Sequence, residues 1–430
     1  MGQGTVDTTM TSVAGSDTGL SSDRLPGALA LVACVLIVAL PLAMTLANRS
    51  APLIVLLAAA VAATSAWLTD RDAFLADALR CAATPLAAAA ALALAYALTA
   101  TLWSPDPVVA LGVFAEAALS LAGGIALAFA LPRVAPRGLI VWVAAGVGLA
   151  CVLVIADMAL GLPLRRALTA QKVADYAYNR PLILFTLLLW PALTPRTPRD
   201  PSVGHALAAL LALACLRSDS GAATLGLAIG LAAYGLALAL PLRLLPALAA
   251  GGFAFALLLA PFAGDLAGRA VPDGAHEAME GHHSRDRIEI WQTFQEVAAR
   301  RPLGGTGFGS SGLVVDDAVA AEIPPEHRAF LTIGHPHNGF LQVWAELGAL
   351  GAGFALLVGA LGLRAMRHLP PPQARAAFAL SACACGIALV GHGAWQGWWI
   401  ASAAAAVALI RVGAARHGPK RNGSPQGASA

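Results

Sequence analysis

The sequence predicts an all-α protein that crosses a membrane many times. Of its 430 residues, 58% are hydrophobic and only 12% are charged, whereas a soluble domain carries about 25% charged residues. The apolar residues come in runs of about 17–25, which is long enough to cross a bilayer as helices. The net charge of +3 is small and does not point to nucleic acid. We therefore interpret the basic residues as signals of membrane topology.

Twelve apolar runs are expected to form transmembrane helices. They cover residues 26–47, 51–68, 83–102, 108–132, 138–160, 178–194, 203–219, 220–239, 242–262, 336–363, 376–392 and 395–412. The boundary between the seventh and eighth depends on one short polar stretch, Arg217-Ser218-Asp219-Ser220-Gly221. Alanine and glycine are abundant in the runs, which suits close approach of helices in a membrane.

These runs divide the chain into five parts. Residues 1–25 are expected to be a disordered cytoplasmic tail rather than a cleavable signal peptide, because they are polar. Residues 26–262 hold the first nine helices, with an amphipathic periplasmic segment at 160–180. A large, partly helical loop spans 263–335. The last three helices fill 336–412, and a second polar tail follows at 413–430.

Lysine and arginine set the expected orientation. If the N-terminus is cytoplasmic and the helices alternate, fifteen basic residues lie inside and twelve outside. Ten of those twelve lie in the two long outside segments, and long loops are translocated largely regardless of charge. Both termini are therefore expected in the cytoplasm. All six cysteines lie in or beside apolar runs, so neither a disulfide framework nor a zinc site is expected.

The stretch from Gly334 to Gly348 combines polar groups with an apolar helix. Pro336 is expected in the first helical turn together with His337. There the helix dipole would lower the pKa of His337 and leave a neutral base near pH 7. Asn338, Gln342 and Glu346 follow at spacings of four, on one helical face. Polar groups in an apolar setting cost free energy unless they are paired, so this face is a candidate site.

Three motifs in the order found here resemble a known family. They are Arg287-Ile288-Glu289-Ile290-Trp291, then residues 302–309 (PLGGTGFG), then His335-Pro336-His337-Asn338 leading into residues 341–348. The pattern resembles the superfamily of O-antigen ligases and O-antigen polymerases of bacterial envelopes, and it is closest to the ligase branch. The motifs occupy about 65 residues, and the twelve-helix layout extends the similarity to the whole chain.

The resemblance implies an enzyme of lipopolysaccharide assembly with a GT-C-like fold in the bacterial inner membrane. Such enzymes transfer O-antigen glycan from undecaprenyl diphosphate to a sugar hydroxyl of lipid A–core, on the periplasmic face. The transfer is inverting and needs no metal or other cofactor. The family's loop histidine falls on His337 and its loop arginine on Arg287. A further family arginine, near the seventh-to-eighth helix junction, is displaced here to Arg217.

The chemistry of the residues agrees with that reaction. A departing diphosphate needs its negative charge neutralised, which arginines can do through forked hydrogen bonds. The candidate diphosphate-binding residues are Arg287, Arg217, Arg285, Arg166 and Arg180, with Arg165 also facing outside. A neutral His337 can take the proton of the attacking hydroxyl. We expect His335, Asn338, Gln342, Glu346 and Trp291 to support these groups.

Simpler interpretations compete for the same residues. His337 could be a hydrogen-bonded surface residue, Arg287 could pair with Glu289 or Asp286, and Arg217 could snorkel. Arg165 and Arg166 could contact anionic headgroups. The glycines at 304–309 could cradle a phosphate or form turns. His276, His282 and His283 lack carboxylate or thiol spacing, so a surface loop is favoured there over a metal site.

The function itself has alternatives. An O-antigen polymerase or a protein O-oligosaccharyltransferase would use the same donor and the same catalytic groups with a different acceptor. A transporter of lipid-linked glycan is the alternative without chemistry, but transporters usually show internal repeats and broken helices near the midplane. The sequence shows no convincing repeat, and its polar residues gather at one membrane face.

Overall fold

The protein is a helical bundle. The computed structural model describes residues 24–168, 175–194, 202–272, 274, 284–391 and 393–416, and in these ranges all regular structure is helical. Within them, ten helices are long and apolar enough to cross a membrane. The predicted class, an all-α multi-pass membrane protein, is confirmed. Most of both predicted tails, 1–25 and 413–430, lies outside the described residues, as do residues 169–174 of the predicted amphipathic segment.

The ten helices are joined by shorter ones. They are α1 (Arg24–Leu46), α2 (Ala51–Thr69), α4 (Pro85–Ala100), α5 (Pro107–Val134), α6 (Leu139–Ala159), α10 (Gly221–Ala239), α11 (Leu245–Leu259), α16 (Gly339–Arg364), α17 (Pro371–Val390) and α18 (Gly397–Ala415). The two other expected runs form the shorter helices α8 (Asn179–Ala192) and α9 (Ser202–Leu216). The connecting helices are α3 (Arg71–Ala82), α7 (Pro163–Leu168), α12 (Ala263–Ala270), α14 (Ser284–Arg300) and α15 (Val319–Glu322).

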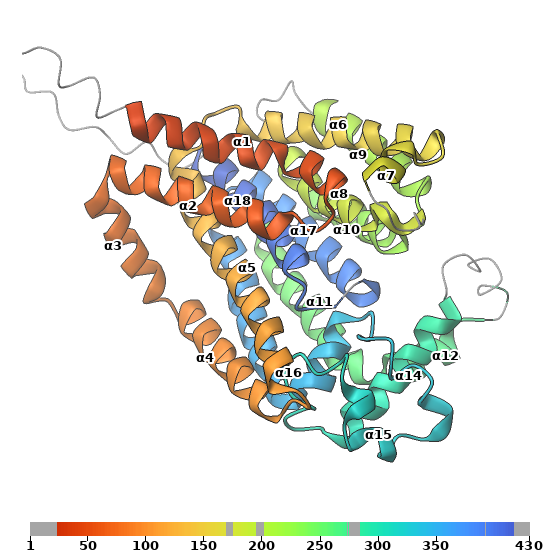
Figure 1. Ribbon diagram of the computed structural model, residues 1–430. Helices are drawn as coiled ribbons and strands as arrows, with labels where there is room; N and C mark the ends of the chain where they lie inside the picture. The colour runs from red at the N-terminus through yellow and green to blue at the C-terminus, as the bar shows by residue number, and fades with distance from the viewer. Residues whose placement is uncertain are drawn as a thin grey trace, which may run out of the picture.

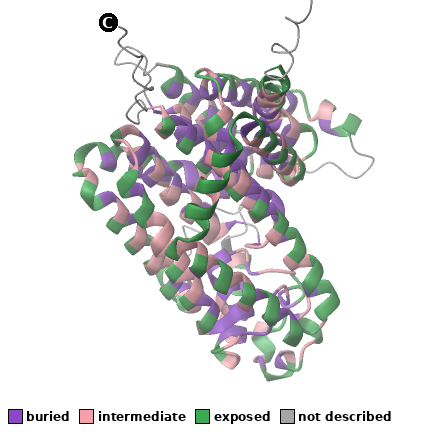
Figure 2. Cartoon of the chain, turned by 90° about the vertical axis from the view of Figure 1, so that its left-hand side faces the viewer, coloured by how far each residue is buried: buried purple, intermediate pink, exposed green. Residues whose placement is uncertain are grey.

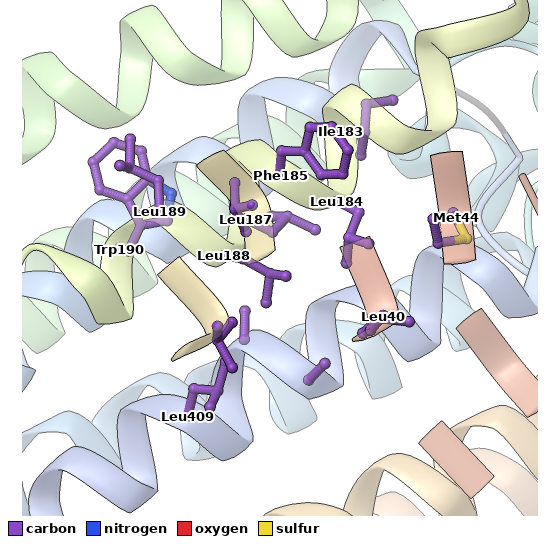
Figure 3. Close-up of a cluster of buried hydrophobic side chains, with 14 of the residues drawn as sticks. Leu40, Met44, Ile183, Leu184, Phe185, Leu187, Leu188, Leu189, Trp190 and Leu409 are labelled. Carbon is purple, nitrogen blue, oxygen red and sulfur yellow. The ribbon is translucent and has the colours of Figure 1, made fainter. Parts of the chain in front are cut away.

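Helix α8 forms the centre of the largest core cluster. Residues 182–190 of this helix are all buried, from Leu182 to Trp190. They pack against α1 through Leu40 and Met44, and against α18 through Leu409 (Figure 3). A helix that is apolar on every side is stable only when it is enclosed by other helices. This enclosure explains how α8 belongs to the bundle although it has only 14 residues.

The outer sides of the bundle are apolar as well. Large side chains such as Leu31, Leu92, Val108 and Trp142 are exposed, and exposed residues follow the outward faces of the helices (Figure 2). Lipid tails solvate such surfaces as well as a protein core would. The apolar exterior is therefore the expected counterpart of a bilayer.

The helices α12, α14 and α15 gather at one end of the bundle, beside the tips of α4 and α16 (Figure 1). The indole N–H of Trp103, which follows α4, donates to the carbonyl of Gly304 at 3.3 Å. At the opposite end of the bundle, other helix ends contact one another. There Arg133, at the end of α5, forms a salt bridge with Asp77 of α3 at 2.7 Å. The described residues of the segment 263–335 thus pack on a single end of the bundle.

A kink in α16 anchors this segment. Gly348 has φ +62° and ψ −160°, which interrupts the helical hydrogen bonds. The freed groups pair with the glycine-rich loop: Ala345 O accepts from Thr306 N at 2.9 Å, and Ala349 N donates to Pro302 O at 2.8 Å. A Cβ on Gly305, where φ is +64°, would lie 2.2 Å from the carbonyl carbon of Glu346. Of the two expectations for these glycines, the geometry matches turns that dock on α16.

Replacing Gly305 by alanine should destabilise the fold by about 1–3 kcal/mol or more, because the residue needs a left-handed conformation and has no room for a Cβ. Gly304→Ala is the matched control, since its nearest neighbour would be 3.9 Å away. Thermal unfolding of both variants in detergent measures the difference. Equal melting temperatures would contradict this account of the loop.

Candidate active site

The site is built around the start of α16, which differs from the sequence expectation in one respect. The helix begins at Gly339, and Asn338 is its N-cap: the Asn338 Oδ1 atom accepts hydrogen bonds from the N–H groups of Phe340 and Leu341, both at 3.1 Å. The prediction that Pro336 and His337 lie in the first turn was therefore wrong. His337 precedes the cap with φ +50°, an unusual conformation for a residue with a side chain.

The imidazole of His337 is held by a backbone carbonyl. The ring donates a hydrogen bond to Gly391 O, just after α17. In a neutral imidazole only one nitrogen carries a hydrogen, so this bond leaves the lone pair on the other nitrogen. Burial lowers the pKa of His337, and the charge of Arg287 lowers it further, while the Gly391 bond opposes them. The pKa of His337 is lowered, as the sequence predicted. The causes are burial and the charge of Arg287, whereas the sequence suggested the helix dipole.

His335 packs against His337. Their ring centroids are 4.2 Å apart, and the backbone N–H of His337 donates to His335 Nδ1 at 3.2 Å. Burial, followed by the charges of His337 and Arg180, lowers the pKa of His335 to about 4. His335 is thus neutral at physiological pH and acts as a hydrogen-bond acceptor that fixes the backbone beside His337.

Two arginines act on the histidine pair, and neither forms an ion pair with a carboxylate in the described part of the chain. Arg287, in the first turns of α14, is half-buried, and burial lowers its pKa. It forms no ion pair with Glu289 or Asp286 in the described part of the chain. Arg180, the second residue of α8, lies over the ring of Trp398 at 5.5 Å. Positive charge is therefore available on both sides of the imidazoles.

Glu346 connects the elements around the site. It is completely buried, and its carboxylate accepts hydrogen bonds from five donors. They are Gly309 N (2.6 Å), Ser311 Oγ (2.5 Å), Ser311 N (3.3 Å), Gln342 Nε2 (2.8 Å) and Trp395 Nε1 (2.7 Å). A buried carboxylate is tolerated when hydrogen bonds replace its hydration.

The same network positions the loop that holds His337. Gln342 uses its amide N–H on Glu346 and its Oε1 on Ala394 N, which donates at 2.7 Å. Together with Trp395, this fixes the described residues 393–396 of the connection between α17 and α18. Gly391, whose carbonyl binds His337, belongs to the same connection. Glu346 thus acts on the histidine through Gln342 and a backbone loop.

The other predicted site residues are Trp291, Arg285, Arg217 and Arg166. Trp291 packs with Phe340 and Leu341, and its buried Nε1 has no partner. Arg285 is exposed near the start of α14. Arg217, also exposed, lines a separate cavity of about 310 Å³ together with Asp219 and the end of α6. Arg166 is exposed on α7. No contact among the described residues joins Arg217 or Arg166 to the histidine pair.

Two charged residues near the site, Glu116 and Arg49, were not predicted from the sequence as site residues. Glu116 of α5 accepts a hydrogen bond from Gly397 N at 2.9 Å, and its charge acts on Arg180. Arg49, in the turn after α1, also acts on Arg180. An acid within the expected apolar run 108–132 was a visible signal. Nothing in the sequence near Arg49 indicates which other helix it meets.

A large apolar cavity extends from the site into the bundle. Its volume is about 950 Å³, and it is enclosed mainly by α16, α17 and α18. Phe340, Ala388 and Trp399 line it near the histidines, while His368 and Arg411 line the opposite end. A cavity of this shape and lining suits a hydrocarbon chain.

No group of three or more His, Cys, Asp or Glu side chains that could hold a metal ion occurs among the described residues. His276, His282 and His283 lie outside them.

Fold and site together define a multi-pass membrane protein whose extramembrane segment folds back on a histidine at the start of a membrane helix. Residues 206–356, which include Arg287, His337 and Glu346, match the family model described as O-antigen ligase. This part of the chain is similar to the O-antigen ligase domain, and the resemblance drawn from the motifs is confirmed.

Curated relatives support the same assignment. A protein of Rickettsia bellii (strain RML369-C) named "Putative polysaccharide ligase" is 29% identical over 155 residues, which is 34% of this chain and 37% of the relative. A protein of the same name from Rickettsia felis (strain ATCC VR-1525 / URRWXCal2) is 28% identical over 130 residues, 29% of this chain and 31% of the relative. The chain thus spans about a third of the length of the relatives it matches.

Glu346→Gln should destabilise the protein by about 3 kcal/mol or more, because an amide N–H₂ would face donors and leave them unpaired. Glu289→Gln, on the exposed face of α14, is the control. Thermal unfolding in detergent measures both. A melting temperature for Glu346→Gln equal to that of the control would refute the hydrogen-bonded clamp.

Proposed function

We propose that the protein is an inverting, metal-independent glycosyltransferase of the bacterial inner membrane. It transfers O-antigen glycan from undecaprenyl diphosphate to a hydroxyl of a lipid A–core sugar, with the site facing the periplasm and both termini in the cytoplasm. The observation that carries the proposal is the setting of His337, in which burial and the charge of Arg287 lower the pKa of the imidazole. Gly391 fixes its tautomer, and the guanidinium of Arg287, which forms no ion pair among the described residues, acts on it.

The chemistry assigns one task to each group. His337 accepts the proton of the acceptor hydroxyl through the ring nitrogen that does not donate to Gly391. The hydroxyl oxygen forms a bond to the anomeric carbon, and the bond from that carbon to the diphosphate oxygen breaks with its electron pair. The departing lipid diphosphate gains negative charge, which Arg287 and Arg180 stabilise. Both substrates are anchored in lipid, so their alignment supplies much of the rate enhancement.

Two further observations support a lipid-linked donor. The apolar cavity of about 950 Å³ offers room for part of an isoprenoid chain, and one end of it lies beside Phe340 in the first turn of α16. The named Rickettsia relatives are described as polysaccharide ligases, which fits transfer of a preassembled glycan. The acceptor distinguishes the ligase from a polymerase or a protein O-oligosaccharyltransferase.

His337→Ala should lower the transfer rate by more than about a hundredfold, the contribution expected of a general base. His327→Ala, in the same extramembrane segment, is the control and should transfer normally. Purified protein, lipid-linked donor and separate acceptors (lipid A–core, glycan or protein) supply the assay. Full activity of His337→Ala would eliminate the proposed mechanism, and product on glycan alone would reassign the enzyme as a polymerase.

Arg287→Ala should be similarly damaging, and Arg287→Lys should restore only part of the activity, because lysine cannot make forked hydrogen bonds to phosphate. Arg269→Ala is the control, since Arg269 is an exposed arginine of the same segment. Initial rates at saturating donor, with chelator added throughout, test both points. Equal rates for the alanine and lysine variants would argue against diphosphate binding by Arg287.

The pH profile gives an independent test of the base. The transfer rate should rise with pH through the lowered pKa of His337, because only the neutral form accepts a proton. Arg287→Gln removes a positive charge that disfavours the imidazolium, so the pKa of His337 should rise and the acid limb of the residual activity should move to higher pH. A limb that stays in place, or moves to lower pH, would contradict this coupling.

A further inference from the structure

The turn between α1 and α2 brings a third arginine to the site. Met44, near the end of α1, packs in the core cluster that contains Ile183 and Leu184 of α8 (Figure 3). Arg49 follows shortly after α1 ends at Leu46, and Arg180 lies one turn before Ile183. The packing of these two helices therefore sets Arg49 and Arg180 at the same end of the bundle, and the positive charge of Arg49 repels that of Arg180.

No ion pair relieves this repulsion in the part of the chain that the structure describes. Glu116 is the carboxylate whose charge acts on Arg180, and one of its oxygens already accepts the N–H of Gly397. Trp398 lies under the Arg180 guanidinium and adds no charge. The Arg180 guanidinium thus faces the positive charge of Arg49 and one partly engaged carboxylate, an arrangement that an added anion would stabilise.

Neighbouring polar groups point to the same ligand. Ser50 is the N-cap residue of α2, but its side chain makes no capping hydrogen bond, and its buried hydroxyl has no hydrogen-bond partner among the described residues. A hydroxyl beside an arginine is a suitable donor to a phosphate oxygen. His335 links this group to His337, since the charges of both Arg180 and His337 act on it. The anion site is therefore continuous with the histidines but distinct from Arg287.

We propose that Arg49 and Arg180 together bind one phosphate group of the lipid-linked diphosphate, with the Ser50 hydroxyl as an additional donor. This inference rests on the proposed transferase function, because it names residues that hold the substrate of that reaction. Both arginines lie at the ends of membrane helices, the level at which a diphosphate attached to a lipid must lie. Arg287 acts from the extramembrane segment on the other side of the histidine pair.

Binding of inorganic pyrophosphate to the purified full-length protein in detergent tests the proposal without catalysis. Arg49→Ala should weaken binding about tenfold, the effect expected for a hydrogen bond to a charged group, and Arg49→Lys should weaken it less. Arg269→Ala should bind as the unaltered protein does. In a double-mutant cycle with Arg180→Ala, the double variant should lose less pyrophosphate affinity than the product of the two single-variant losses, because both arginines contact one phosphate.

Unchanged pyrophosphate affinity in Arg49→Ala, or strictly multiplicative losses in the cycle, would overturn the shared site. A variant that loses only its association with phosphatidylglycerol vesicles would assign Arg49 to phospholipid headgroups instead. His337→Ala separates this proposal from the function: it should bind pyrophosphate normally and fail to transfer glycan. If it transfers normally, the proposed function fails while the binding result still decides the role of Arg49.

Discussion

The buried carboxylate of Glu346 is the constraint on which the rest of the site depends. Its donors come from three separate parts of the chain: the glycine-rich segment at 309–311, Gln342 of α16 itself and Trp395 before α18. A charge in an apolar bundle is stable only while such donors stay in place. The demand for hydrogen bonds therefore holds together an extramembrane loop, a kinked helix and the loop that orients His337.

The kink at Gly348 and the clamp at Glu346 complement each other. Breaking the helix frees backbone groups at membrane depth, which is tolerated only when protein satisfies them. Residues 302–307 supply the missing partners, and Gly305 and Gly348 allow the close approach. The glycines that the sequence left open as a phosphate cradle or turns thus have a demonstrable structural use. Phosphate binding is more reasonably assigned to side chains whose charges are not neutralised.

The sequence correctly predicted the helical class. It also identified polar residues that are unusual in an apolar setting. His337, Gln342 and Glu346 are polar groups beside or within a long apolar run, so their presence alone signals a cost that something must offset. Arg287 lies in the polar segment and was indicated by the family motif. The partners of these groups could not be predicted. Ser311, Gly391 and Trp395 are distant in the chain, and only packing of α16 between its neighbours brings them together. The start of α16 was misplaced because Asn338 caps it with its own side chain.

The placement of charge explains why the histidines remain neutral and yet lie beside cations. Burial and nearby guanidinium groups both disfavour the imidazolium, so each arginine that would bind an anionic donor also keeps His337 able to accept a proton. Binding of a diphosphate would partly cancel that effect, since added negative charge raises the basicity of the imidazole. In the proposed reaction, the donor would therefore strengthen the base at the moment the acceptor hydroxyl needs it. The same arginines would thus couple substrate binding to proton transfer without any change of conformation.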